Sequence, residues 1–441
     1  MAATSLRERM LIKELAEQGL QDRRIAEQMQ MSVHTVRKWR RKGQRLGCTG
    51  LYSRMGRPQQ GALSSFPRAL VAQIQGWRRS HPGWGPKTLR TELEVSGLFP
   101  GQKLPSLSAL TRWVQESGAA RSYHKHSELP KPAASVALAC HEEWEMDARG
   151  HEKIPEVGVI ALIQVNDVYS KVKLMSYPCW VGEKRLTRHP TTEDYQTVLR
   201  LAFLQWGLPE RLAVDHESVF FDNLSKSPFP TRFHLWLTAL GIQLTFGRMG
   251  RPTDQAMTER SHQTWQHQVL EGQRFETWRQ LFQALEQRRD FLNRFLPCAT
   301  LNETPPLVAS PQAAIPRRPY RSEWEADLLD LSRVHAYLAD LQWFRKASNV
   351  GAVSLGGQVY CLGIAWKHVE VTITFDPVDA SLVFSSRDLH KRLPIQKLSS
   401  ADLMGNLAVF AAKVNFQLAL PFSMADWQTA FNAGLLRDMT L

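Results

Sequence analysis

Residues Trp144–Val165, with the sequence WEMDARGHEKIPEVGVIALIQV, decide the fold of this chain. Trp144–Ala148 is typical of a short strand that ends at Asp147. Val157–Val165 is an almost unbroken apolar run, as expected for a strand at the buried centre of a sheet. Lys171–Tyr177 then alternates between polar and apolar residues, which predicts a third strand. Three consecutive strands therefore open a sheet.

The residues that follow predict helices and strands in alternation. A helix begins at Thr192 and ends at Gly207, and the strand Leu212–Val214 leads directly into Asp215. The pattern continues with a helix from Thr231, a strand over Ile242–Phe246, a helix from near Thr253 that carries Glu259, and a last helix containing Trp278, Leu281, Phe282 and Leu285. This order predicts an α/β core over residues 141–296, with helices on both faces of the sheet.

Three carboxylates of this core are candidates for chemistry. Asp147 and Asp215 each follow a predicted strand, and the carboxyl ends of strands are where α/β sheets place their sites. Glu259 projects from a helix near those ends. Carboxylate oxygens suit Mg²⁺ or Mn²⁺, and two such ions about 4 Å apart catalyse in-line phosphoryl transfer. Spacing alone leaves open that Asp147 is a turn residue and Glu259 a solvated helix charge.

Charge separates the N-terminal part from the rest. The 441 residues carry a formal net charge of +13, and residues 1–130 alone account for it with 22 basic and 9 acidic side chains. The remainder is balanced. A basic segment of this kind predicts contact with a polyanion such as DNA, whose binding weakens steeply with salt. A basic surface that serves only solubility is the alternative.

Residues 1–45 predict a helix-turn-helix domain. Leu11, Ile12, Leu15 and Ala16 form one helical stripe, a short helix follows from Asp22, and Ser32 caps a third helix. An ordinary three-helix bundle is the alternative. The outward face of the third helix supplies donors for base edges and phosphates, namely His34, Thr35, Arg37, Lys38, Arg40 and Arg41.

Residues 46–65 predict a basic linker that follows the DNA backbone or enters the minor groove, as part of a Gly- and Arg-rich stretch from Gly43 to Pro58. Its candidate DNA contacts are Arg45, at its border, Arg54 and Arg57. Residues 66–118 predict a second helix-turn-helix domain, in which Thr111 and Arg112 lie near the exposed side of the last helix. Residues 119–140 predict another linker.

The C-terminal third predicts three further parts. Residues 297–325 are Pro-rich and predict a linker, residues 326–395 predict a small SH3-like β-barrel, and residues 396–441 predict a helical tail. Five scattered cysteines without a CxxC predict free thiols in a reducing cytoplasm. No apolar run approaches the ~20 residues that span a bilayer. The chain is thus predicted to be a multidomain α/β protein with an all-α N-terminal part.

Several motifs together resemble one family. The segments WEMDARG, RLAVD and GRPTDQAMTERSHQTW are similar to the DDE motif of bacterial insertion-sequence transposases of the retroviral integrase superfamily. GCTGLYSRMGRP and HPGWGPKTLRTELE resemble the linker and second helix-turn-helix of the same enzymes, and the Gly-rich stretch from Trp343 resembles their C-terminal module. The resemblance covers residues 5 to about 380 in the same order.

The resemblance implies an RNase H-like core, two Mg²⁺ or Mn²⁺ ions, and 3′-end cleavage followed by strand transfer by a multimer on DNA. Asp147, Asp215 and Glu259 take the places of the metal ligands. The chain departs from the family where His216-Glu217 replaces Asn-Gly, and in the 43 residues between Asp215 and Glu259, whose excess is expected in Asn223–Pro230.

Other residues and functions rank lower. Asp167 is expected to end a strand in a turn, Asp222 to cap or turn, and Trp265 to lie in the core. Arg260 and His262 are candidate DNA-phosphate contacts, with surface ion pairs as the alternative. A DNA-binding regulator without catalysis and a nuclease without joining activity are the alternative functions. The tail is a candidate contact for a second subunit or an accessory ATPase, with simple packing as the alternative. The protein is expected in the bacterial cytoplasm, associated with the nucleoid.

Overall fold

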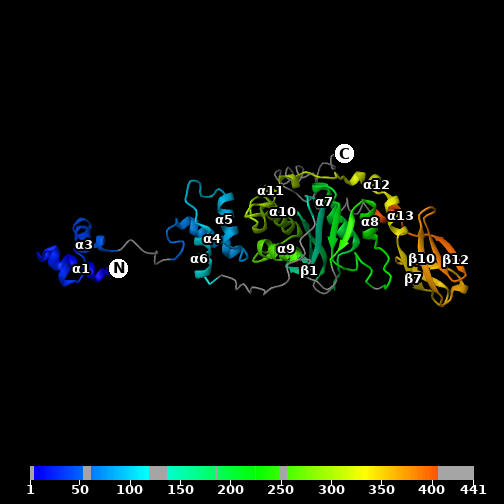
Figure 1. Cartoon of the computed structure of the whole chain (residues 1–441), viewed down its shortest axis with the longest axis horizontal. Coiled ribbons are helices and arrows are strands. Elements are labelled where there is room, and N and C mark those ends of the chain that lie inside the picture. The colour runs from blue at the N-terminus through cyan, green and yellow to red at the C-terminus, as the bar shows by residue number, and fades with distance from the viewer. Residues whose placement is uncertain are drawn as a thin grey trace.

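The computed structural model describes residues 4–52, 61–118, 137–183, 186–223, 225–247 and 256–405. Along the chain they form two helical modules, a central α/β core and a C-terminal β region (Figure 1). The five cysteines are free, as predicted. Within the described ranges, no helix combines the length and the apolar character needed to cross a membrane.

The first helical module extends beyond its predicted end. Its helices are α1 (Leu6–Glu17), α2 (Asp22–Gln28) and α3 (Val33–Leu46), and Ser32 caps α3 as predicted by accepting from Thr35 N. The turn η1 (Gly47–Leu51) then folds back and buries Leu51 completely against the helices. Residues 43–51 are therefore not an extended linker, because Leu51 completes an apolar core that the three helices alone leave open.

The second helical module agrees with the predicted pattern. It contains α4 (Arg68–Ser80), α5 (Pro86–Val95) and α6 (Leu107–Glu116), and Ser106 caps α6 by accepting from Ala109 N. Leu70, Ile74 and Leu110 are fully buried at its centre. Leu63 joins this core, so the second module begins before residue 66.

A six-stranded mixed sheet forms the centre of the α/β core, with the order β4-β3-β2-β1-β5-β6. The first three strands pair antiparallel, whereas β5 and β6 run parallel to β1. Their bounds are β1 (Glu143–Ile154), β2 (Gly158–Asp167), β3 (Lys173–Glu183), β4 (Leu186–Thr187), β5 (Arg211–Val214) and β6 (Gln243–Phe246). The predicted α/β architecture is confirmed.

Helices cover both faces of this sheet. Alternate side chains of β1 and β2, such as Trp144 and Ile163, pack into one core with α7 (Thr192–Trp206) and α8 (Arg232–Ala239). On the opposite face, Ile160 and Leu162 pack against Trp265 and Leu281. These two come from α9 (Ala256–Trp265) and α10 (Trp278–Arg294), which the π-helical turn η3 (Gln266–Leu270) joins.

The Pro-rich segment 297–325 is not a free linker. It forms short helical turns that pack along the core, where His141 Nε2 donates to Ala313 O at 2.8 Å. Glu325, fully buried, accepts two hydrogen bonds from Arg200, at 2.6 and 2.7 Å, and a third from Trp236. The turns are η4 (Ala299–Leu301), α11 (Pro306–Ala309), η5 (Pro311–Ala314), η6 (Ser322–Trp324) and α12 (Glu325–Leu328).

The C-terminal region is rich in short strands, as predicted. After α13 (Leu331–Ala339), four strands pair antiparallel in the order β12-β11-β10-β7, and β8 and β9 form a separate hairpin. The pairings do not by themselves close a barrel, so the SH3-like barrel stays a prediction. The bounds are β7 (Gln342–Lys346), β8 (Ala352–Leu355), β9 (Gln358–Cys361), η7 (Ile364–Trp366), β10 (Glu370–Asp376), β11 (Ser381–Ser386), β12 (Leu389–Pro394) and α14 (Ser400–Met404).

The loop after Asp215 connects this region to the core. Trp343 Nε1 donates to Pro228 O at 3.1 Å, Arg345 donates to Ser227 O at 2.8 Å, and the ring of Phe229 lies 4.8 Å from that of Trp343. The extra residues between Asp215 and Glu259 therefore include the segment on which β7 rests.

Candidate active site

Asp147 and Asp215 lie at neighbouring positions in the sheet. Asp215 follows β5 directly, as predicted. Asp147 lies in the middle of β1, not at its end, because β1 continues its antiparallel pairing with β2 as far as Ile154. The parallel pairing of β1 with β5 stops at Glu145 and Ala213, so both aspartates lie just beyond it. Asp147 and Asp215 therefore lie side by side as expected, although the predicted end of β1 at Asp147 was wrong.

Burial and the charge of Asp215 both act on Asp147. Burial is the main cause that raises the pKa of Asp147 from 3.8 to about 6, and the negative charges of Asp215 and then Glu217 contribute to this shift. A hydrogen bond from Ala148 N, 2.8 Å long, acts in the opposite direction. Burial also raises the pKa of Asp215. Buried like charges make the ionised pair costly unless a cation joins them.

His262 faces this pair from α9. Its Nε2 lies 3.5 Å from Asp147 Oδ2, and its backbone carbonyl accepts from Arg149 at 3.2 Å. Burial, and then the charge of Arg149, lower the pKa of His262 to about 4, so the imidazole is neutral at pH 7. His262 thus lies within the acidic site and adds no positive charge to it, and its expected contact with DNA phosphate stays a prediction.

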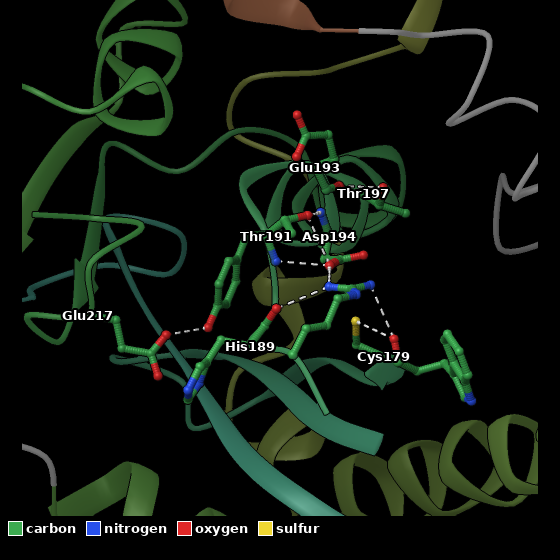
Figure 2. Close-up of polar contacts among 10 residues, drawn as sticks. Cys179, His189, Thr191, Glu193, Asp194, Thr197 and Glu217 are labelled. Atoms are coloured by element: carbon green, nitrogen blue, oxygen red, sulfur yellow. Dashed lines mark hydrogen bonds and ion pairs between the residues drawn. The ribbon is translucent and has the colours of Figure 1, made fainter. Parts of the chain in front are cut away.

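Glu217 is a further carboxylate of the site that the sequence analysis did not select. Tyr195, from α7, donates its hydroxyl to Glu217 Oε2 at 2.7 Å, and His189 lies beside the carboxylate (Figure 2). Burial raises the pKa of Glu217, and Asp215 adds to this effect, whereas Tyr195 and His189 oppose it. The backbone N–H of Glu217 donates to Asp215 Oδ1 at 3.0 Å, so the same turn also orients Asp215. The unusual His216-Glu217 pair was the available signal.

Glu259 lies on α9, as predicted, but its side chain is outside the described residues. Among the side chains that the structure describes, no three His, Cys, Asp or Glu residues come together as a metal site. The described pair, Asp147 and Asp215, nevertheless fits a divalent cation in ligand type and charge: both are hard oxygen donors, burial raises the pKa of each, and the charge of Asp215 adds to this effect at Asp147.

The predicted DNA-binding residues of the first module lie along α3. His34, Arg37, Lys38, Arg41 and Arg45 are exposed, and Thr35 and Arg40 are half-buried. Two of these cations already have a partner, because Asp22 pairs with Arg40 at 2.7 Å and with Arg37 at 3.5 Å. The remaining cations, Lys38, Arg41 and Arg45, keep the α3 face basic. Arg54 and Arg57 lie outside the described residues.

The second module is docked on the core beside α9. Trp84 donates through Nε1 to Gln268 O at 3.1 Å, and the guanidinium of Arg288 stacks 4.3 Å from the Trp84 ring while it pairs with Glu92. Gly83 packs so closely that a Cβ there would lie 2.1 Å from His267 O. The module is thereby held on η3, the turn that follows the Glu259 helix directly.

Other candidate residues occupy ordinary positions. Thr111 is half-buried on α6, where its hydroxyl donates to Leu107 O, and Arg112 is half-buried next to it. Arg260 is exposed on α9. Asp167 accepts from His141 N and Ser170 N at the end of β2, which confirms its structural role. Trp265 is fully buried in the core, as predicted.

Comparison with known proteins identifies one domain. Residues 3–52 match the homeodomain-like domain family, so the first module is a helix-turn-helix domain of that class. The chain is also similar to a chain in the structure of the simian T-cell lymphotropic virus intasome in complex with PP2A regulatory subunit B56 gamma, with 14% identity and a TM-score of 0.32, over 70% of this chain and 96% of that one.

Two integrase catalytic core domains are similar at the same level. That of HTLV-2 integrase in complex with magnesium has 14% identity and a TM-score of 0.29, over 39% of this chain and 97% of its own. That of BIV integrase has 14% identity and a TM-score of 0.28, over 39% of this chain and 95% of its own. Likeness at this level transfers no residue role to this chain.

Proposed function

We propose that the protein is a DNA transposase, a polynucleotidyl transferase that cleaves 3′ ends at its element and transfers them to target DNA. The observation that carries the proposal is the acidic pair of Asp147 and Asp215, which lies just beyond the parallel pairing of β1 and β5 and whose pKa values burial raises. A mixed sheet with three antiparallel strands followed by parallel ones agrees with the order of elements that the residue pattern predicts for the core.

In this proposal, Asp147 and Asp215 hold Mg²⁺ or Mn²⁺ together with Glu259. The bound ions would activate the attacking water or 3′-hydroxyl and stabilise the leaving oxygen of an in-line displacement. Asp215 is kept in position by the Glu217 backbone N–H. Neutral His262 leaves the negative charge of Asp147 available for cation binding, where a charged partner would compete.

DNA recognition is assigned to the two helical modules. The α3 face of the homeodomain-like domain supplies the exposed cations Lys38, Arg41 and Arg45 for phosphates and base edges, and α6 contributes Thr111 and Arg112. Because the second module is docked on η3, DNA on α6 would lie at a constant distance from α9 and from Arg260 on it. A multimer on DNA is proposed on the sequence resemblance alone.

The test is a cleavage and joining assay with purified full-length protein, Mg²⁺ and DNA from the ends of its own element. Asp215→Asn should abolish both nicking and joining and leave DNA binding unchanged. Asp222→Asn, a carboxylate seven residues further along the same loop, is the matched control and should keep activity. If the wild type binds DNA without nicking it, the alternative of a DNA-binding regulator without catalysis is favoured. If it nicks DNA without joining it, the alternative of a nuclease without joining activity is favoured. Unchanged cleavage by Asp215→Asn would refute the assignment.

A further inference from the structure

The sheet face that α9 covers is polar around Asp147. Glu145 and Asp147 of β1 stand directly opposite Asn166 and Gln164 of β2. Opposed residues of antiparallel strands point to the same face, so these four polar side chains form one block. Gln164 is 0% exposed and Asn166 is 2% exposed. Polar residues thus extend from the acidic pair into the interior of the protein.

Buried polar atoms without hydrogen-bond partners gather at this place. Neither Gln164 Oε1 nor Gln164 Nε2 has a partner in the part of the chain that the structure describes. Native proteins satisfy the large majority of such atoms, because leaving one unsatisfied destabilises the fold. The same shortage affects Asn166 Nδ2, Ser176 Oγ, His262 Nε2, Trp265 Nε1 and Gln266 Oε1.

Gln164 differs from its polar neighbours. Asn166 accepts from Lys173 at 3.4 Å, and Lys173 also donates to Ser261 of α9 at 3.3 Å, so that pair ties the helix to the sheet. Gln164 takes no part in this tie. It interrupts the apolar run of β2 at the one position opposite Asp147, where an aliphatic side chain would be less costly.

Asp147 can accept one more hydrogen bond. Its Oδ1 accepts from Ala148 N at 2.8 Å, but Oδ2 lies 3.5 Å from His262 Nε2, which is too long for a good hydrogen bond. The Cβ atoms of directly opposed residues in an antiparallel pair are about 4.5–5.5 Å apart, which is within reach of a glutamine amide.

We propose that Gln164 is a positioning residue for Asp147, to whose carboxylate it donates a hydrogen bond through Nε2–H when the site holds its divalent cation. This inference rests on the proposed function. Carboxylates that ligate metals are themselves held by hydrogen bonds, and loss of such a partner lowers metal affinity about 10- to 100-fold. A role of this kind accounts for a costly amide at this position.

The test separates metal affinity from stability with Gln164→Met, which keeps the length and volume of the side chain. Mn²⁺ binding to the full-length protein is measured by electron paramagnetic resonance of the free ion, and unfolding is measured in EDTA. The Mn²⁺ dissociation constant of the variant should rise about 10- to 100-fold, with stability unchanged or increased. Ser176→Ala, which removes the unpartnered buried hydroxyl of the β3 residue paired with Gln164, should leave Mn²⁺ affinity unchanged.

Each other outcome overturns the inference. Wild-type Mn²⁺ affinity in Gln164→Met would show that the amide does not act on the site, and a loss of stability would show that it holds the sheet together. Asp147→Asn in the same titration separates this failure from that of the proposed function. If Asp147→Asn binds Mn²⁺ as the wild type does, the metal site itself is refuted. If Asp147→Asn loses Mn²⁺ binding and Gln164→Met does not, the metal site is supported and the positioning role of Gln164 is refuted.

Discussion

Asp147→Asn should stabilise the metal-free protein at neutral pH. In the folded chain, burial and the charge of Asp215 raise the pKa of Asp147 from 3.8 to about 6. The folded state therefore binds a proton more tightly than the unfolded state. As pH rises from about 4 through about 6, ionisation of Asp147 costs the folded state stability, and an amide at this position avoids that cost.

The size of the effect follows from the shift. One pKa unit corresponds to about 1.4 kcal/mol, so a change from 3.8 to about 6 corresponds to ~3 kcal/mol. The Asp147 side chain is 19% exposed, and solvent screening reduces this value. We expect Asp147→Asn to be more stable than the wild type by about 1–3 kcal/mol above pH 7 and equal to it below about pH 4.

The assay is hydrogen exchange of the β2 amides (Gly158–Asp167) in EDTA, together with urea unfolding, over this pH range. Exchange reports on the core alone, which matters because the chain has several folded parts that need not unfold together. Asp222→Asn serves as the control for loss of a carboxylate. A difference between Asp147→Asn and the wild type that stays constant with pH, or a variant less stable at pH 7, would refute the electrostatic account.

Three further predictions concern the rest of the chain. Gly83→Ala should release the second module from the core, because the added Cβ would lie 2.1 Å from His267 O. Hydrogen exchange in η3 should then rise. Gly76→Ala, where the added Cβ meets open space, should leave this exchange unchanged. Glu325→Ala should lower stability by about 3–5 kcal/mol in thermal unfolding because it leaves the buried charge of Arg200 without its carboxylate partner, and exposed Glu323→Ala should have no such effect. Arg41→Ala should weaken DNA binding, measured by fluorescence anisotropy, and should reduce the slope of log affinity against log salt concentration by about one. If Arg41→Ala and the wild type had the same slope, a phosphate contact of Arg41 would be contradicted.

Local patterns were sufficient for most elements. The apolar run of β2, the capping residues Ser32 and Ser106, and the stripe of Leu70 and Ile74 all predicted elements that the structure contains. These signals depend on residues close together in the chain, where capping bonds and periodic burial act directly. The juxtaposition of Asp147 and Asp215 was also predicted, and it holds although Asp147 lies in the middle of β1, because the parallel pairing of β1 with β5 stops two residues before each aspartate.

Predictions failed where distant segments supply the missing partner. The end of β1 was misplaced because pairing with β2, and not its own composition, extends it to Ile154. The segment 297–325 looked like a linker because its prolines disfavour regular structure, but Arg200 and Trp236 hold its Glu325. The stretch from Gly43 to Pro58 looked like an extended basic linker, but burial of Leu51 folds its residues 43–51 onto α1–α3.

The sequence by itself determined the order of the modules, the basic N-terminal part and the acidic candidates, since these depend on residue type and short-range periodicity. Only the tertiary structure decided which charges meet. It placed neutral His262 and the unpredicted Glu217 beside the aspartates, seated the second module on η3, and set a buried glutamine opposite Asp147. Electrostatic and hydrogen-bond energies depend on distance and burial, and chain folding alone sets both for residues remote in sequence.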